Sequence, residues 1–341
     1  MPKAGPSQNS RYVRRVKISA IGCYVPPKKL TNTDLEKIVD TNDEWIITRT
    51  GIRTRHIVEE DVATSDLSVA AAKIVLEQRG LKGSDIDTII VCTVTPDMMF
   101  PSTACLVQDR LGAKGAWGFD LLAACSGTVF GLTTGAQMIA SGAQNRVLVI
   151  GADTMSKIVD YQDRATCVLF GDAAGAVLLE PSDEPELGLL DYINEVDGSG
   201  GNMLYMPAGG SRHPASLETL KQRMHYVHQD GRQVFKWAVR KMSDVCVQIL
   251  ERNGYTPEDV DVLLLHQANG RIISAVADRL GLPSDKAINV IEEYGNTTGA
   301  TIPLAAREVL NDGRLKKGDL VVMCAVGAGL TAGAALWRWA Y

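Results

Sequence analysis

The chain has 341 residues, more than one ordinary hydrophobic core accommodates, so its length predicts two domains or two fused halves. Hydrophobic residues make up 45% and charged residues 22%, values typical of a globular protein. The net charge of −5 argues against nucleic acid as the main partner, and no apolar run approaches the length needed to span a membrane.

The N-terminal stretch from Met1 to Lys17 is polar and basic and lacks the apolar core of a secretory signal. Residues 1–10 are interpreted as a disordered lead-in. The seven cysteines are scattered without a C-x-x-C pair, a pattern that favours reduced thiols over a disulfide framework. Reduced thiols and the lack of a secretory signal lead us to expect a cytoplasmic protein. No Cys/His cluster has the spacing of zinc ligands, so we expect no metal site.

Two stretches of the chain repeat the same order of predicted elements. In each stretch an apolar strand is followed by a helix, and later a second helix is followed by a second strand. The predicted strands span residues 85–91 and 147–150 in the first stretch and residues 259–265 and 320–323 in the second. The shift of roughly 170 residues is far longer than the period of a solenoid repeat, so we predict a duplicated domain.

Strands that are almost entirely apolar and alternate with helices indicate parallel sheets covered on both faces. We therefore predict an α/β protein with two similar halves, residues 11–183 and 184–341, joined near residues 180–186. The stretch from Val196 to Asp230 is rich in Gly, Met and His and has weak periodicity. We interpret this stretch, about 196–230, as an insertion or cap over a site.

Cys125 lies where an apolar strand pattern ends and a helical pattern begins. A thiol at such a junction faces a helix N-terminus, whose free N–H groups and dipole favour the thiolate. The flanking Ala-Ala and Ser-Gly pairs allow a sharp turn and a close approach of the backbone. A buried structural thiol is the alternative, but we interpret Cys125 as a nucleophile for acyl transfer through a thioester.

Two later segments supply polar partners for this thiol. His266 follows four apolar residues and precedes Gln-Ala-Asn, so it ends a predicted strand of the second half. Asn296 is placed at a position equivalent to Cys125, entering a helix after a strand. Ligands of doubly wound sheets bind beyond the carboxyl ends of strands, so the three side chains can converge. Taken singly, His266 could be a core histidine and Asn296 a helix cap, so the hypothesis depends on all three.

Two further features fit an acyl-transfer site. Gly327, Ala328 and Gly329 follow the last predicted strand, and small residues let backbone N–H groups face a ligand oxygen, as an oxyanion hole requires. A plain tight turn is the alternative. A basic stripe at helical spacing is formed by Arg232, Lys236 and Arg240. Such a stripe is usually a solvated face, but on an acidic protein it would suit an acidic carrier partner.

These motifs resemble those of 3-oxoacyl-acyl-carrier-protein synthase III, a family of condensing enzymes in the thiolase-fold superfamily. The resemblance runs from Val16 to the C-terminus and is carried by residues 43–53 (DEWIITRTGIR), 123–127, 266–269 and 295–298. It implies a thiolase-like fold in which duplicated βαβ halves form a layered α-β-α-β-α architecture. It also implies an acyltransferase that initiates type II fatty acid synthesis, joining an acyl-CoA primer to malonyl-acyl carrier protein with loss of CO2.

The resemblance also implies roles for individual residues. Cys125, His266 and Asn296 would be catalytic, and the backbone N–H groups of Cys125 and Ala328 would form the oxyanion hole, although many relatives have glycine at the latter position. The positions that would contact CoA are Trp45, Arg49, Arg164, Gly231, Phe235, Ala268 and Asn269. Phe100 matches a residue that reaches into the acyl pocket of the other subunit in a homodimer, and Lys236 and Arg271 match carrier-docking positions. Acyl-CoA is a substrate, so no cofactor is implied.

Several alternatives stay open. A thiolase would need a second cysteine as a base, and Cys324 lies near the glycines at 327–329. A hydroxymethylglutaryl-CoA-type synthase would need a catalytic glutamate that no motif supplies. A polyketide-initiating synthase shares the same chemistry, and an inactive acyl-CoA-binding protein would share only the fold. The primer also stays open, because its size depends on packing near residues 98–100 and 196–230.

Overall fold

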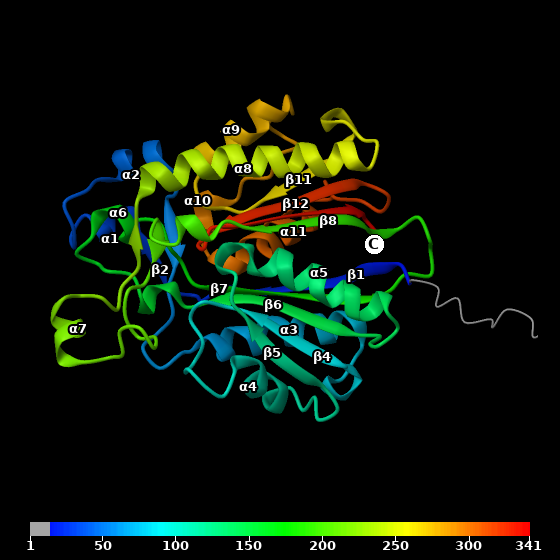
Figure 1. Cartoon of the computed structure of the whole chain (residues 1–341), viewed down its shortest axis with the longest axis horizontal. Coiled ribbons are helices and arrows are strands. Elements are labelled where there is room, and N and C mark those ends of the chain that lie inside the picture. The colour runs from blue at the N-terminus through cyan, green and yellow to red at the C-terminus, as the bar shows by residue number, and fades with distance from the viewer. Residues whose placement is uncertain (1–13) are drawn as a thin grey trace, which may run out of the picture.

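The computed structural model describes residues 14–341, so the predicted disordered lead-in at residues 1–10 lies outside the described residues. The described chain forms five layers in the order helices, sheet, helices, sheet, helices (Figure 1). This arrangement confirms the predicted α-β-α-β-α architecture. Within residues 14–341, no helix combines the length and apolar character that crossing a membrane requires.

The two sheets have matching strand orders. The first sheet is ordered β1-β7-β6-β4-β5 and the second is ordered β8-β13-β12-β11. The strands of the first sheet are β1 (Val16–Tyr24), β4 (Thr88–Cys92), β5 (Trp117–Leu121), β6 (Val147–Asp153) and β7 (Ala173–Pro181). Those of the second are β8 (Gly188–Val196), β11 (Val262–Leu265), β12 (Leu320–Gly327) and β13 (Thr331–Arg338). The counterpart of β5 in the second half is only a bridge between Leu263 and Ala287. This correspondence confirms the predicted duplication.

The prediction of purely parallel sheets is wrong. β4 runs parallel to β5 and β6, and β11 runs parallel to β12, but β7 and β13 are antiparallel to both of their neighbours. β12 and β13 are joined by a short turn at residues 328–330, and a connection of that length forms only an antiparallel hairpin. The apolar strand sequences reflect burial on both faces, which helices provide whatever the strand direction. The sequence analysis placed residues 327–329 after the last strand, and this is also wrong, because β13 follows them in the hairpin.

Helices cover both faces of each sheet. The central layer contains α5 (Gly127–Ala140) and α11 (Thr301–Asn311), and its apolar side chains pack with those of both sheets. The outer helices are α3 (Thr64–Arg79) and α4 (Thr103–Arg110) on the first sheet, and α8 (Gly231–Arg252) and α9 (Gly270–Leu280) on the second. Glycines let α5 lie close to the first sheet, because a Cβ on Gly131 would come within 2.6 Å of the Cys92 sulfur.

A smaller set of elements lies at the end of the layers where α2 and α6 are drawn in Figure 1. The helices there are α1 (Asn32–Leu35), α2 (Asp43–Thr50), α6 (Arg164–Cys167) and α10 (Ile291–Tyr294), and the strands are β2 (Lys29–Thr31) and β3 (Thr54–His56). Their apolar side chains form a separate core cluster. This part of the chain supplies one wall of the cavity described below.

The chain leaves the first sheet at Pro181 and enters the second at Gly188. The segment 196–230 then contains β9 (Leu204–Tyr205), α7 (Leu217–Lys221) and β10 (His228–Gln229), and β9 pairs with β10. Only the parts of this segment at β9 and β10 reach the main cavity. The part that carries α7 projects from the body of the molecule (Figure 1). The predicted cap therefore covers the cavity with its two short strands only.

Candidate active site

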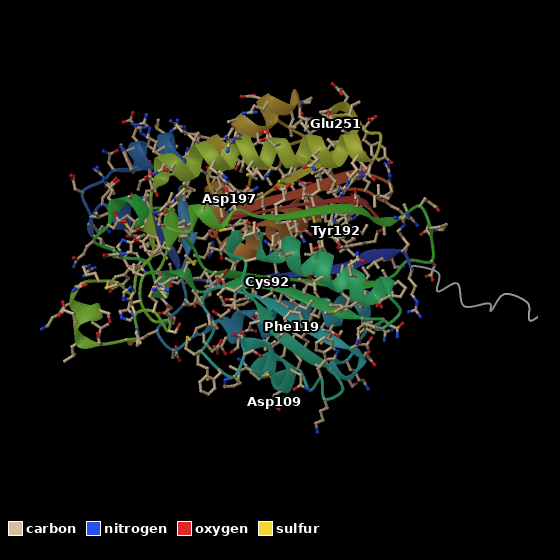
Figure 2. The ribbon with its side chains drawn as sticks, in the orientation of Figure 1. Cys92, Asp109, Phe119, Tyr192, Asp197 and Glu251 are labelled. Carbon is tan, nitrogen blue, oxygen red and sulfur yellow. The ribbon has the colours of Figure 1, made fainter. Side chains whose placement is uncertain are left out.

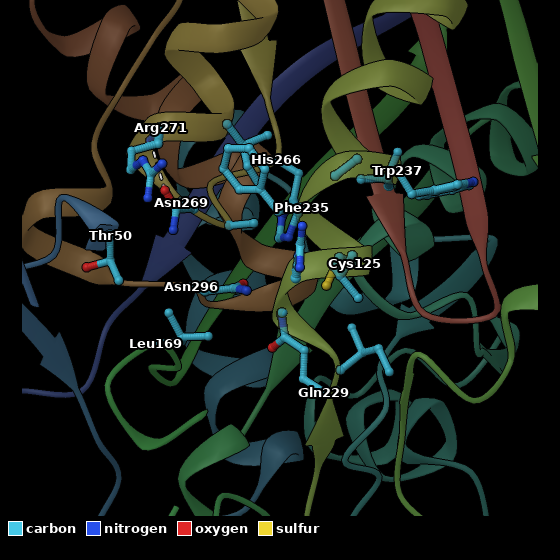
Figure 3. A pocket seen from close by; sticks show the side chains of 18 of the residues that line it. Thr50, Cys125, Leu169, Gln229, Phe235, Trp237, His266, Asn269, Arg271 and Asn296 are labelled. Atoms are coloured by element: carbon cyan, nitrogen blue, oxygen red, sulfur yellow. Dashed lines mark hydrogen bonds between the residues drawn. The ribbon is translucent and has the colours of Figure 1, made fainter. Parts of the chain in front are cut away.

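A cavity of about 620 Å³ lies between the two halves of the chain. Its lining includes Cys125 from the first half and His266 and Asn296 from the second half. These three side chains are buried, whereas lining residues such as Arg49 and Lys236 are exposed, so the three lie at the deep end of the cavity. Figure 3 shows them arranged around this end. The structure thus brings the three predicted catalytic residues together.

Cys125 lies in a short 3-10 turn, η2 (Ala124–Ser126), between β5 and α5. The backbone turns sharply there because Ala124 has a left-handed φ of 49°. Gly127 then starts α5 directly against β4, since a Cβ at this position would lie 3.1 Å from the Cβ of Cys92. The prediction of a thiol at a strand-to-helix junction is therefore confirmed.

The prediction that this junction favours the thiolate is wrong for the resting protein. Burial, together with the nearby carboxyl of Asp153, raises the pKa of the Cys125 thiol to about 12. Cys125 is only 7% exposed, so the loss of hydration outweighs the helix dipole. Cys125 is consequently a neutral thiol until a substrate changes its surroundings.

His266 directly follows β11, as predicted, and is buried at the deep end of the cavity. Its Nδ1 lies 2.8 Å from Oγ1 of Thr301, the first residue of α11. Burial lowers the pKa of His266 to about 3. The imidazole is therefore neutral at physiological pH, with Nδ1 held by Thr301 and Nε2 left for a ligand.

Asn296 is held by three hydrogen bonds. Its N–H donates to the carbonyl of Leu169 at 2.9 Å, and its own carbonyl accepts from the N–H of Gly171 at 3.0 Å. Its side-chain Oδ1 accepts from the N–H of Thr298, also at 3.0 Å. Because Oδ1 is used in this way, the Nδ2 amide group remains to donate a hydrogen bond to a ligand in the cavity.

The predicted equivalence of Cys125 and Asn296 is wrong by three residues. Thr298 repeats the φ of 49° found at Ala124, and each of the two lies three residues before the first residue of its helix, α11 or α5. The counterpart of Cys125 is therefore Gly299, within the 3-10 turn η6 (Thr298–Ala300). Asn296 also follows α10 and not a strand. The duplicated fold still delivers its side chain to the same cavity.

The turn that connects β12 to β13 lies against the nucleophile. A Cβ on Gly327 would come within 2.8 Å of the backbone nitrogen of Cys125. Ala328 is not itself in the cavity lining, although Gly327 and Leu330 are. Among residues 14–341, the N–H of Ala328 donates no hydrogen bond within the protein. The N–H of Ala328, next to Gly327 in the turn, is therefore free to bind a ligand oxygen, which suits an oxyanion hole.

The mouth of the cavity carries most of the residues predicted to contact CoA or a carrier. The lining includes Trp45, Arg49, Gly231, Phe235, Lys236, Ala268, Asn269 and Arg271. Arg164 lies outside the lining, but its guanidinium stacks over the Trp45 ring at 5.1 Å. Phe100 is 85% exposed and lies away from the cavity. Of the basic stripe, Arg232 and Lys236 line the cavity and Arg240 does not.

The charges at the mouth have one sign. Arg49, Arg232, Lys236 and Arg271 are in the lining, and no aspartate or glutamate of residues 14–341 is. Arg271 also packs over the ring of Phe235, at 5.4 Å, and its N–H is capped by the side chain of Asn269 (Figure 3). An anionic ligand is therefore favoured at this opening, although the protein is acidic as a whole.

Sequence reasoning missed several residues of the cavity. Leu204 and Gln229 reach it from β9 and β10, and residues 168–170 form part of its wall. Thr298 and Thr301 support Asn296 and His266 from below. The hydroxyl pattern in residues 297–301 was the available signal for the last two. No local pattern indicates the others, because their position depends on distant packing.

The structure also weighs the alternatives left open by the sequence. Cys324 lies fully buried in β12 and does not line the cavity, so it does not serve as the second cysteine of a thiolase. The lining has no glutamate of the kind that a hydroxymethylglutaryl-CoA-type synthase would need. The fold and this Cys-His-Asn cavity define an acyltransferase of the thiolase-fold condensing class.

Comparison with known proteins places the chain within that class. Sequence profiles described as 3-oxoacyl-[acyl-carrier-protein (ACP)] synthase III and as its C terminal match residues 119–198 and 250–339. The beta-ketoacyl-[acyl-carrier-protein] synthase III of Solibacter usitatus is 62% identical, covering 96% of this chain and 99% of the relative. That of Koribacter versatilis is 58% identical with the same coverage. The chain belongs to the 3-oxoacyl-[acyl-carrier-protein] synthase III family.

Solved structures agree with this placement. The 3-oxoacyl-[acyl-carrier-protein] synthase III of Aquifex aeolicus is 45% identical, with a TM-score of 0.87 over 95% of this chain and 100% of that chain. The priming beta-ketosynthase of the R1128 polyketide biosynthetic pathway is 33% identical, with a TM-score of 0.88 over 98% and 99%. A priming enzyme of a polyketide pathway therefore shares this fold.

Proposed function

We propose that the protein condenses an acyl-CoA primer, such as acetyl-CoA, with malonyl-acyl carrier protein to start type II fatty acid synthesis. The observation that carries this proposal is the convergence of Cys125, His266 and Asn296 at the deep end of one cavity. A nucleophilic sulfur and two neutral hydrogen-bond donors are the groups that thioester exchange and decarboxylation require. The cationic mouth supports a thioester substrate whose non-acyl part, such as CoA, carries phosphates.

In the first half-reaction, the sulfur of Cys125 attacks the thioester carbon of acyl-CoA. The bond from the acyl carbon to the CoA sulfur breaks, and the thiol proton passes from Cys125 to the departing CoA sulfur, so that no net proton is released. Negative charge on the carbonyl oxygen is stabilised by the N–H groups of Cys125 and Ala328. The resting thiol is neutral, so proton and acyl group must move together.

In the second half-reaction, a malonyl thioester occupies the same cavity. Loss of CO2 leaves its electron pair on the thioester as an enolate, so no base has to remove a carbon-bound proton. Nε2–H of His266 and Nδ2–H of Asn296 donate hydrogen bonds to the enolate oxygen as its charge develops. The enolate carbon then attacks acyl-Cys125, and the released sulfur takes up one proton to restore the thiol.

The mouth of the cavity supports the proposed partners. Trp45, with Arg164 stacked on it, offers a platform for the adenine of CoA, and Arg49 offers a cation for its phosphates. Lys236 and Arg271 are exposed at the same opening, where an acidic carrier protein would dock. Acyl-CoA enters as a substrate, so we propose no resident cofactor and no metal.

We also propose a homodimer. β5 is an edge strand of the first sheet, and Phe119, labelled in Figure 2, lies on it. Trp117 on the same strand is 51% exposed, and Leu122 and Phe100 nearby in the fold are more exposed still. An exposed apolar edge of this kind is normally covered by a partner strand. The cysteines of the described chain form no disulfide, which supports a cytoplasmic location.

The proposed function is tested by the mass of the intact protein after incubation with acetyl-CoA. We expect a covalent acetyl group on Cys125, and its discharge as 3-oxobutanoyl-carrier protein when malonyl-carrier protein is added. The Cys125→Ala variant serves as the control and should gain no mass. Acylation at another residue, or condensation by Cys125→Ala, would refute the proposal.

A second candidate is priming of a polyketide pathway, favoured by the 33% identity to the R1128 priming enzyme. The chemistry is the same, so the two are separated by the carrier. Condensation rates with fatty acid and polyketide carrier proteins, at equal malonyl loading, distinguish them. Faster turnover with the fatty acid carrier supports the first proposal.

A further inference from the structure

Asp153 is a buried carboxyl group that the proposed reaction does not use. It ends β6 in the first half of the chain and is 1% exposed. Two hydroxyls and one backbone N–H of residues 93–95 donate to its Oδ1 at 2.8–3.1 Å. From the second half, the Thr298 hydroxyl and the Gly299 N–H donate to its Oδ2. One side chain therefore ties the two halves together beneath the cavity.

Every group that hydrogen-bonds to Asp153 is a donor, and such an environment suits an ionised carboxylate. Burial raises the pKa of Asp153, while hydrogen bonds from Thr298, Val94, Thr93 and Gly299 lower it. Taking a carboxyl group out of water is costly unless such bonds replace the lost hydration. These five bonds fix the carboxylate relative to residues 93–95 of the first half and residues 298–299 of the second.

Of the residues bonded to Asp153, Thr298 is the one that also hydrogen-bonds to a proposed catalytic residue. Its hydroxyl donates to Asp153, and its N–H donates to Oδ1 of Asn296 at 3.0 Å. Its φ of 49° is unfavourable for a β-branched residue and persists only where the surroundings impose it. The bond to Asp153 imposes it from one side. As a result, the amide of Asn296 presents Nδ2–H to the cavity and not its oxygen.

Thr298 is also connected to His266 by hydrogen bonds through Thr301. The carbonyl of Thr298 accepts from the backbone N–H of Thr301 and lies 2.9 Å from its hydroxyl. The same hydroxyl lies 2.8 Å from Nδ1 of His266. The Thr301 hydroxyl has one proton, which it can donate to this carbonyl or to Nδ1, and the choice decides the tautomer of His266. A proton donated to Nδ1 places the imidazole proton on Nε2, which faces the ligand.

We propose that Asp153, Thr298 and Thr301 form a buried positioning unit that fixes Asn296 as an Nδ2–H donor and neutral His266 as an Nε2–H donor. This inference rests on the proposed function for its consequence, because the two donors serve decarboxylation. None of the three positioning residues touches the substrate. They act on decarboxylation through Asn296 and His266, whereas the one effect on Cys125 is the Asp153 charge, which raises the pKa of its thiol.

The kinetic test separates the two half-reactions. Acylation of Cys125 is followed by intact mass with acetyl-CoA, and decarboxylation by CO2 release from malonyl-carrier protein. Asp153→Asn and Thr298→Val should lower decarboxylation about tenfold or more, while acylation falls less than about threefold. Acylation by Asp153→Asn should, if anything, rise, because the charge that raises the Cys125 pKa is removed. Thr298→Ser keeps the hydroxyl and should restore most of the decarboxylation rate.

A matched control removes a buried hydroxyl from another part of the central layer. Thr133 lies on α5, donates to the carbonyl of Phe130 at 3.0 Å and accepts from Asn194 at 2.8 Å. Thr133→Val should lower Tm by an amount similar to Thr298→Val but leave the ratio of the two half-reaction rates unchanged. Equal losses in both half-reactions, or a loss that follows Tm alone, would overturn the proposal.

A spectroscopic test does not depend on activity. The 15N chemical shifts of labelled histidine report which ring nitrogen carries the proton, and the His266→Asn variant identifies the signal among the five histidines. The wild type should show Nε2–H, Thr301→Ser should keep it, and Thr301→Val should shift the population toward Nδ1–H. An Nδ1–H tautomer in the wild type would overturn the assignment of Thr301.

The two readouts keep this inference separate from the proposed function. A wild-type protein that is not acylated by any CoA thioester would contradict the proposed function, while the histidine tautomer would still be decided by the 15N shifts. If the wild type condenses normally but the variants lose both half-reaction rates equally, the proposed function stands and the positioning unit is wrong.

Discussion

Gly327 lies so close to Cys125 that a Cβ on the glycine would come within 2.8 Å of the cysteine backbone nitrogen. The same Cβ would meet the hydroxyl of Thr331 at 2.9 Å. The β12–β13 turn and the nucleophile therefore fit together only without a side chain at position 327. This contact places the turn where it can stabilise charge on a substrate oxygen.

We predict that Gly327→Ala lowers the rate of Cys125 acylation by about 100-fold, because the added methyl group separates the two N–H groups of the oxyanion hole. The rate is measured by intact mass with acetyl-CoA. Gly210→Ala is the matched control, because a Cβ at Gly210 meets no atom within 4 Å. Normal acylation by Gly327→Ala would mean that the turn does not contribute to the hole.

The stack of Arg164 on Trp45 predicts a role in binding the nucleotide part of CoA. Trp45→Ala should raise KM for acetyl-CoA about tenfold, since an aromatic stack on a base contributes about 1–3 kcal/mol. It should leave the rate with acetyl-N-acetylcysteamine unchanged, because that thioester lacks the nucleotide. Comparison of kcat/KM for the two substrates makes the measurement, and an equal loss for both would contradict this role.

The raised pKa of Cys125 predicts how its reactivity depends on pH. Burial and the Asp153 carboxyl favour the neutral thiol, so the rate of alkylation at Cys125 should keep rising from pH 7 to pH 10 without a plateau. Iodoacetamide labelling with peptide mapping separates Cys125 from the exposed Cys105. A plateau below pH 8 would show that the thiolate is already stabilised in the free protein.

The lowered pKa of His266 predicts a pH-dependent stability. Its folded-state pKa of about 3 lies below the ordinary value of 6.5, so the neutral ring stabilises the fold above pH 6.5. This contribution is lost as pH falls from about 6.5 toward 3, because the unfolded chain then binds a proton that the folded one excludes. Thermal unfolding between pH 4 and pH 7 should show a smaller slope for His266→Gln than for the wild type.

The exposed edge of β5 predicts a dimer that charge can disrupt. Trp117→Arg should convert the protein to a monomer, because the buried interface cannot accommodate an unpaired guanidinium. Sedimentation velocity at micromolar concentration measures the change. Leu217→Arg on the projecting α7 adds the same charge at an exposed apolar residue and serves as the control. A wild-type monomer would contradict the proposed assembly.

The three proposed catalytic residues were predictable because their signals are local. Cys125 and His266 each stand at the end of an apolar strand pattern, and the structure places both at strand ends. Asn296 was predicted from a short Asn-Thr-Thr motif, and its alignment with Cys125 was wrong by three residues because η6 begins only at Thr298. A repeat estimated from sequence spacing does not resolve an offset of this size.

The features that sequence reasoning missed depend on contacts between distant segments. Strand direction in the second sheet follows from the β12–β13 hairpin, which the apolar pattern does not reveal. The thiol pKa depends on how completely the second half covers Cys125, and a helix N-terminus alone gives the opposite direction. Asp153 matters because it meets Thr298 from the other half of the chain, a pairing invisible to any local motif.

The cationic opening lies on a protein whose net charge is −5. The net charge repels an acidic partner at a distance, whereas the cations at the opening attract it at close range. The distribution of charge thus orients an arriving carrier before any contact forms. Added salt would weaken this orienting effect, because it shortens the range of the electrostatic interaction.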